Sequence, residues 1–162
     1  MAEKKDVILG ISLGTRRLGV AIGTKKELID WQLKAFAGVF TPTKASKMCR
    51  VVERLIEIYP VSAIALKASQ PEKRSAGINY CLSALSCLAQ SKQIPFYLYS
   101  IDDIENRFMK EGKKNKMGFV SWILHIYPEL QKEYRKVQSG KGLYYIKLFE
   151  AVAVIALTLR IQ

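Results

Sequence analysis

Two short apolar segments joined by a tight turn constrain the fold of this chain more than any other feature. Residues 7–13 form one apolar run, Gly-Thr-Arg-Arg at 14–17 supplies turn residues, and residues 18–23 form a second run. The short connection predicts a β-hairpin. Apolar residues then alternate with polar ones across 28–36, which predicts a third strand and an antiparallel meander.

The pattern that follows alternates helices with strands. Thr41-Pro42 supplies capping chemistry for a helix that Pro60 ends, and residues 63–68 form a strand that is apolar on both faces. A helix over 77–90 and a strand over 96–99 come next. Parallel strands need helical crossovers, so this order predicts an α/β fold with a mixed five-stranded sheet flanked by helices. The length fits a single domain spanning residues 1–162.

The last third of the chain is predicted to be mainly helical. One helix is predicted to begin at residue 101, a second to end at residue 126 and a third to span 144–161. The polar stretch 129–142 is predicted to be a loop or a frayed helix. Trp31 and Trp122 are expected in the core.

The charge is strongly positive. Lys and Arg total 26 against 14 for Asp and Glu, a formal charge of +12, and the isoelectric point is near 9.7. The excess lies in residues 1–54 (11 basic, 5 acidic) and 105–147 (10 basic, 4 acidic), while 55–104 is balanced. Such an excess favours a polyanionic partner, with DNA or structured RNA first and an anionic membrane surface second.

Three cysteines, Cys49, Cys81 and Cys87, form no CxxC pair and leave an odd count, so reduced thiols are expected, as in a cytoplasmic protein. The first residues are polar, without a hydrophobic signal region. The longest apolar run, 148–159, contains Glu150 and is shorter than the roughly 20 residues of a membrane span. It is expected to be a buried helix, and no membrane association is expected.

Residues 8–20, Ile-Leu-Gly-Ile-Ser-Leu-Gly-Thr-Arg-Arg-Leu-Gly-Val, resemble the first motif of the RuvC-type Holliday-junction resolvases and their ribonuclease-H-like relatives. Gly10, Gly14 and Gly19 agree with that motif, but the position of the family's catalytic Asp is Ser12. The YqgF-type nucleases of ribosomal-RNA maturation share this motif and are a competing assignment.

The resemblance continues in order along nearly the whole chain. The Glu that ends the family's fourth strand corresponds to Lys67, and the two Asp residues that open its Ala-rich last helix correspond to Lys147 and Glu150. The glycine-arginine turn and the Ala-rich helix are the more specific parts. The resemblance implies a ribonuclease-H-like fold and a homodimer.

Family nucleases are expected to use Mg²⁺ or Mn²⁺, which bind anionic oxygen ligands. Of the four corresponding positions, only Glu150 is a carboxylate here. A divalent cation about 4 Å from an ammonium meets repulsion of several kcal/mol. We therefore expect no metal cofactor, unless the chain is a nuclease with an atypical site.

The two lysines at these positions allow different arrangements. Lys67 either pairs with Glu150 where a metal would lie or extends its amine into solvent. Lys147 is expected to be exposed and can pair with Glu150 along the helix.

Basic residues near the expected site are candidates for nucleic-acid contacts. Arg offers two parallel donors to a phosphate, and a turn offers backbone N–H groups. The candidates lie in the first turn, in the loop after the fourth strand and in a basic break before residue 118: Thr15, Arg16, Arg17, Lys73, Arg74, Lys110, Lys113, Lys114 and Lys116.

Three functions are open at this point. The first is a catalytically inactive relative of the resolvases that binds branched or duplex DNA through phosphates. The second is a divalent-metal-dependent, structure-selective endonuclease, a resolvase or an RNA-processing enzyme, whose carboxylates come from elsewhere, such as Asp102, Asp103 and Glu105. The third is a scaffold that binds only protein. Of these, we expect the non-enzymatic, nucleic-acid-binding function.

Overall fold

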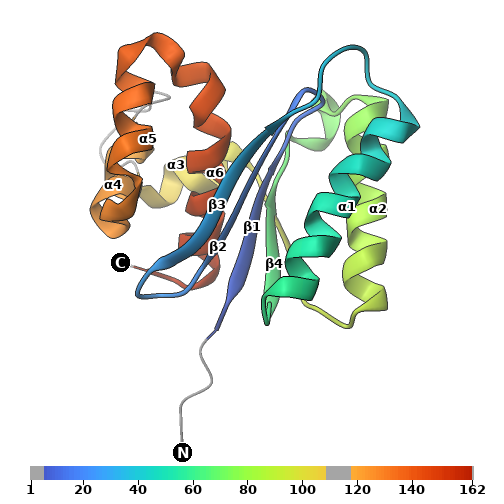
Figure 1. Cartoon of the computed structure of the whole chain (residues 1–162), viewed down its shortest axis with the longest axis horizontal. Coiled ribbons are helices and arrows are strands. Elements are labelled where there is room, and N and C mark those ends of the chain that lie inside the picture. The colour runs from blue at the N-terminus through green and yellow to red at the C-terminus, as the bar shows by residue number, and fades with distance from the viewer. Residues whose placement is uncertain (1–5, 109–117, 162) are drawn as a thin grey trace, which may run out of the picture.

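The computed structural model describes residues 6–108 and 118–161, and they form a mixed sheet flanked by helices (Figure 1). β1 pairs antiparallel with β2, β2 pairs antiparallel with β3, and β4 lies parallel to both β1 and β5. The strand order β3-β2-β1-β4-β5 confirms the predicted fold class. The strands are β1 (Ile8–Leu13), β2 (Arg17–Gly23), β3 (Leu28–Ala35), β4 (Ala63–Lys67) and β5 (Phe96–Tyr99).

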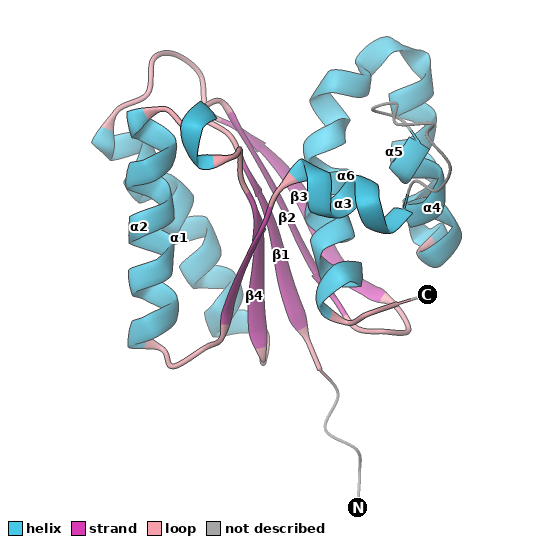
Figure 2. Cartoon of the chain, turned by 180° about the vertical axis from the view of Figure 1, so that it is seen from behind, coloured by secondary structure: helices cyan, strands magenta, loops and turns pink. Residues whose placement is uncertain are grey.

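The helices cover both faces of the sheet (Figure 2). One face is covered by α1 (Pro42–Ile58) and α2 (Ala76–Ser91), and the Thr41 side chain caps α1 by accepting from the backbone N–H of Lys44. The other face is covered by α6 (Gly142–Thr158), around which the shorter helices gather. These are α3 (Ile101–Phe108), α4 (Gly118–Ile126) and α5 (Gln131–Lys136), with short turns at η1 (Pro71–Lys73), η2 (Pro128–Leu130) and η3 (Val137–Lys141).

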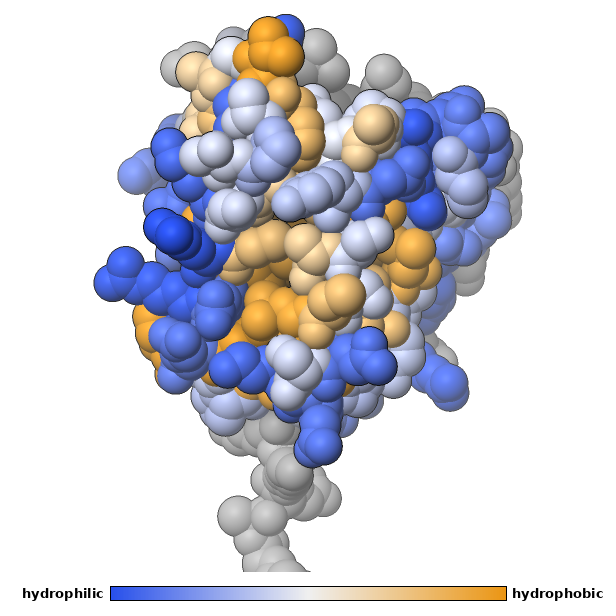
Figure 3. All heavy atoms as spheres, turned by 90° about the vertical axis from the view of Figure 1, so that its right-hand side faces the viewer, coloured by the Kyte–Doolittle hydropathy of each residue, from blue (hydrophilic) through white to orange (hydrophobic). Residues whose placement is uncertain are grey.

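The alternation of side chains along each strand divides the core in two. Leu9 and Ile11 of β1 pack toward α1 and α2, whereas Ile8 packs toward α6. Because successive side chains of a strand point to opposite faces, a continuous apolar strand serves both cores. Figure 3 shows the α1–α2 side of the molecule, where apolar surface is surrounded by hydrophilic residues.

Two glycines allow α6 to lie directly on the sheet. A Cβ at Gly10 would lie 2.0 Å from the carbonyl oxygen of Ala151, and one at Gly19 would lie 2.3 Å from that of Lys147. No side chain fits at either position, which explains the glycines that the sequence places in β1 and β2. The close approach brings the first half of α6 against the carboxyl end of β1.

The structure decides two local predictions. Of the two alternatives for 129–142, it shows helix and not loop, because η2, α5 and η3 span most of this stretch before α6 begins. Trp122 is 47% exposed rather than in the core, while Trp31 is partly buried against the α6-side core. Within the described part of the chain, no helix has the length and apolar character needed to cross a membrane.

Candidate functional site

The first feature of the site is that Ser12 and Lys67 are side-by-side partners in the sheet. They are matched in the parallel register of β1 and β4, so both side chains point to the face covered by α6. Glu150 reaches the same point from α6. The structure thus confirms that Ser12, Lys67 and Glu150 converge at the carboxyl end of β1 and β4.

Glu150 is buried, and each of its carboxylate oxygens has a partner. The Ser12 hydroxyl donates to Oε1 at 3.0 Å, and the Lys67 ammonium lies 2.9 Å from Oε2. The side chains of Lys67 and Glu150 are only 11% and 6% exposed. Of the two arrangements open for Lys67, the structure shows the buried ion pair and not the extension into solvent.

Lys147 lies in the same cluster, and the prediction that it is exposed was wrong. Its side chain is 24% exposed, with Nζ 3.8 Å from Glu150 Oε1 and donating to the Leu13 carbonyl at 3.5 Å. Gly14 leaves room for it, because a Cβ there would lie 3.2 Å from Lys147 Cε. Burial lowers the pKa of Lys147, Glu150 opposes this shift by raising the pKa, and the charges of Lys67 and Arg17 lower it further.

The lowered pKa of Lys147 predicts a pH-dependent contribution to stability. The folded protein releases this proton at a lower pH than the unfolded chain, whose Lys has a pKa near 10.5. The free energy of unfolding should therefore rise with pH between the lowered pKa and 10.5, as the cost of burying the charge disappears. Urea denaturation at several alkaline pH values measures this. Lys147→Met should lose this part of the rise, and an unchanged rise in the variant would contradict the prediction.

The donor set does not fit a divalent cation. Two ammonium groups lie within 4 Å of the single carboxylate, whose oxygens are already occupied. Among residues 6–108 and 118–161 there is no group of three His, Cys, Asp or Glu side chains that could hold a metal ion. A metal placed here would meet positive charges rather than the anionic oxygens that Mg²⁺ requires.

The other carboxylates considered for a nuclease make different contacts. Asp102 accepts from Gln70 Nε2 at 2.6 Å. Asp103 accepts from the Ser100 backbone N–H at 2.7 Å, at the start of α3. Glu105 lies on the same helix. These contacts give Asp102 and Asp103 structural roles at the start of α3.

The candidate phosphate contacts that the structure describes lie at the end of the sheet where β1 and β4 finish. Thr15, Arg16 and Arg17 follow β1, and Arg16 is exposed. Lys73 is exposed on η1, which follows the parallel strand β4, and the Arg74 guanidinium donates to the Ser69 carbonyl at 2.7 Å. Their role in binding remains a prediction. Four further candidates lie outside the described residues: Lys110, Lys113, Lys114 and Lys116.

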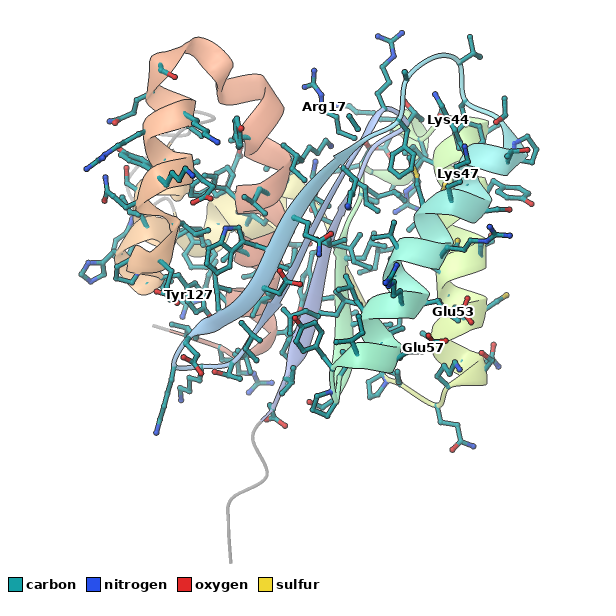
Figure 4. All side chains as sticks on the ribbon, viewed as in Figure 1. Arg17, Lys44, Lys47, Glu53, Glu57 and Tyr127 are labelled. Atoms are coloured by element: carbon teal, nitrogen blue, oxygen red, sulfur yellow. The ribbon has the colours of Figure 1, made fainter. Side chains whose placement is uncertain are left out.

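Lys44 and Lys47, which the sequence did not single out, lie in the first two turns of α1 near Arg17 (Figure 4), and the Lys44 ammonium donates to the Gly38 carbonyl. Ala35 at the end of β3 is paired with Arg17, so the loop from β3 into α1 begins beside the first turn. The predicted meander implies this proximity, because its first and third strands run in the same direction and end at the same end of the sheet.

Comparison with solved structures identifies the fold. Two structures of RuvC from Thermus thermophilus are similar to this chain. One has a TM-score of 0.67 at 16% identity, covering 91% of this chain and 89% of that one. The other, in complex with a Holliday junction substrate, has a TM-score of 0.63 at 13% identity, covering 92% and 89%. No family model and no curated protein matches the sequence. The chain therefore has the ribonuclease-H-like fold that RuvC also has.

Proposed function

We propose that this protein is a catalytically inactive relative of the RuvC-type resolvases that binds branched or duplex DNA through its phosphates. The observation that carries the proposal is the buried ion pair between Lys67 and Glu150, formed where the resemblance places metal ligands. The similar RuvC structure with a Holliday junction substrate supports branched DNA as the ligand.

The positive charges at the carboxyl ends of β1 and β4 favour a bound phosphate. Lys67, Lys147 and Arg17 contribute three positive charges near the single negative charge of Glu150, and they are close enough for Lys67 and Arg17 to lower the pKa of Lys147. A phosphodiester carries one negative charge and accepts hydrogen bonds from ammonium and guanidinium groups. Fixed cations thus supply the neutralisation that metal ions supply in a nuclease, without a metal-activated water.

The proposal predicts binding that weakens steeply with salt. Each phosphate neutralised on duplex DNA contributes a slope of about −0.9 to the logarithm of affinity against the logarithm of salt concentration. Titration of a four-way junction, a duplex and a single strand at several salt concentrations measures this slope. Absence of binding even at low salt would support the protein-scaffold function instead.

Replacing Arg16 and Arg17 together with alanine should weaken binding to all three ligands similarly, because phosphate contacts carry little sequence information. The matched control replaces Lys25 and Lys26 with alanine. This exposed pair lies in the turn between β2 and β3, at the opposite end of the strands. An equal loss of affinity in both double variants would show that the overall charge, and not the turn after β1, determines DNA binding.

The remaining features of the proposal have separate grounds: the chain length for a single domain, the cysteine pattern for the cytoplasm and the resemblance for a homodimer. We propose a single-domain protein that acts in the cytoplasm as a homodimer. Analytical ultracentrifugation of the full chain, alone and with a junction, tests the dimer. A monomer in both states would remove this part of the proposal and leave the binding site intact.

A further inference from the structure

The strand β3 lies at one edge of the sheet, and its backbone alternates between paired and outward-facing groups. The Phe36 N–H donates to the Arg16 carbonyl at 2.8 Å, and the antiparallel register with β2 continues in step to Asp30. Hydrogen-bonded pairs alternate in such a ladder, so Gln32 bonds to β2 while Trp31 and Leu33 direct their N–H and C=O groups outward. No strand in the described part of the chain lies beyond β3.

The side chains of β3 also alternate, and a cavity lies on each side. Trp31 and Leu33 line a cavity of about 240 Å³ toward α5 and α6. Asp30 and Lys34 line one of about 350 Å³ toward α1, with Val51, Leu55 and Ile58 among its walls. Gln32 borders both cavities, so they open at the same point along the strand. Figure 1 shows β3 between α1 and α5, with its outer edge facing the viewer.

Glu133 lines the cavity beside α5, and its carboxylate is only half satisfied. Glu133 Oε1 accepts from the Trp31 indole N–H at 3.2 Å, but Oε2 is buried without a hydrogen-bond partner. The nearby Lys136 ammonium lies instead over the Tyr145 ring, 5.1 Å from its centre, and the ion pairs of the described residues do not include Glu133. A carboxylate oxygen in this position calls for a donor, and the Trp31 ring favours a cationic one.

We propose that β3 binds an extended segment of a partner protein as a sixth strand. A Lys or Arg of that segment enters the cavity of Trp31 and Glu133, and the residues on either side of it enter the cavity beside α1. Adjacent residues of a strand point to opposite faces, and the two cavities share Gln32, so one segment fills both. This interaction is independent of nucleic-acid binding.

A second copy of β3 fits this edge less well. Paired antiparallel about Gln32, it would gain a favourable pair of Asp30 and Lys34 on the α1 side but would leave Glu133 without a cation. On the side of Glu133 it would present Trp31, Leu33 and Ala35, none of which is a cation. The partner is therefore a segment with alternating apolar and polar residues and a basic residue on the polar face.

The probe is a capped nine-residue peptide, Thr-Leu-Thr-Leu-Lys-Leu-Thr-Leu-Thr, added to the full chain. Binding as an antiparallel strand should protect the backbone amides of Trp31 and Leu33 from hydrogen exchange, as read by NMR, while that of Gln32 is already protected. Replacing the central Lys of the peptide with Glu should weaken binding at least tenfold, the size expected for a charge-assisted hydrogen bond.

Modified peptides and protein variants separate the contacts. N-methylation of the two Thr residues nearest the Lys should abolish binding, because their N–H groups face β3, whereas N-methylation of the two Leu residues nearest the Lys should not. In the protein, Glu133→Gln keeps an acceptor for Trp31 and should remove the preference for Lys over Glu in the peptide. Leu33→Pro removes an outward N–H, which an edge strand tolerates, and should abolish binding.

Three results would overturn the inference. The first is no protection of Trp31 and Leu33 at saturating peptide. The second is equal affinity for the Lys and Glu peptides. The third is protection without peptide that grows with protein concentration, which would assign the edge to a second copy. A failure to bind DNA would leave all of these readouts unchanged, so the two proposals fail separately.

Discussion

Replacing Lys67 with methionine should lower the free energy of unfolding by about 3 kcal/mol, because it leaves Glu150 buried without its main counter-charge. The effect is expected at the lower end for a buried ion pair, since Ser12 still donates to Glu150 and Lys147 still lies 3.8 Å away. Urea denaturation with an unchanged dependence on denaturant measures the loss.

A double variant tests the cause of that loss. Lys67→Met with Glu150→Gln removes both charges and keeps an acceptor for Ser12. It should recover more than half of the free energy of unfolding that Lys67→Met loses. The exposed Lys92→Met serves as control and should change stability by no more than about 0.5 kcal/mol. A double variant as unstable as the single one would show that packing, and not the ion pair, explains the effect of Lys67.

Restoring the family's pattern with Ser12→Asp, Lys67→Glu and Lys147→Asp should create a site for a divalent cation. Without metal this triple variant should be less stable than the unmodified protein, because four clustered carboxylates repel one another. Mn²⁺ at 1,000 times its Kd should then stabilise the variant by about 4 kcal/mol. Calorimetry and thermal unfolding with and without Mn²⁺ measure binding and stabilisation.

The unmodified protein provides the comparison, since Mn²⁺ should leave its stability unchanged. A neutral triple variant, Ser12→Asn, Lys67→Gln and Lys147→Asn, separates the new charges from the new shapes and should gain little from metal. Stabilisation of the unmodified protein by Mn²⁺ would contradict the account of the site.

The fold could be predicted because each strand carries a local pattern. The apolar runs, the turn at 14–17 and the alternation of 28–36 define the meander, and the apolar stretch 63–68 defines a covered strand. The convergence of Ser12, Lys67 and Glu150 followed from the resemblance, which aligned positions 138 residues apart that no local pattern connects.

What the sequence did not predict depends on packing. Lys147 is largely buried because α6 approaches the glycines of β1 and β2 closely, and this approach is a tertiary property. Trp122 was assigned to the core by residue type, but the buried side of α4 is formed by Phe119, Val120 and Ile123. The contact between Trp31 and Glu133 joins residues 102 positions apart and has no signal in either segment.

The central claim, that the protein binds DNA with fixed cations and without metal catalysis, is tested most directly with one labelled four-way junction. The purified unmodified protein is mixed with the junction in EDTA and then in Mg²⁺ or Mn²⁺, and complex and product are separated on native and denaturing gels. We expect a complex in EDTA that dissociates with salt, and an intact junction in either metal. Metal-dependent cleavage that Glu150→Ala abolishes would contradict it.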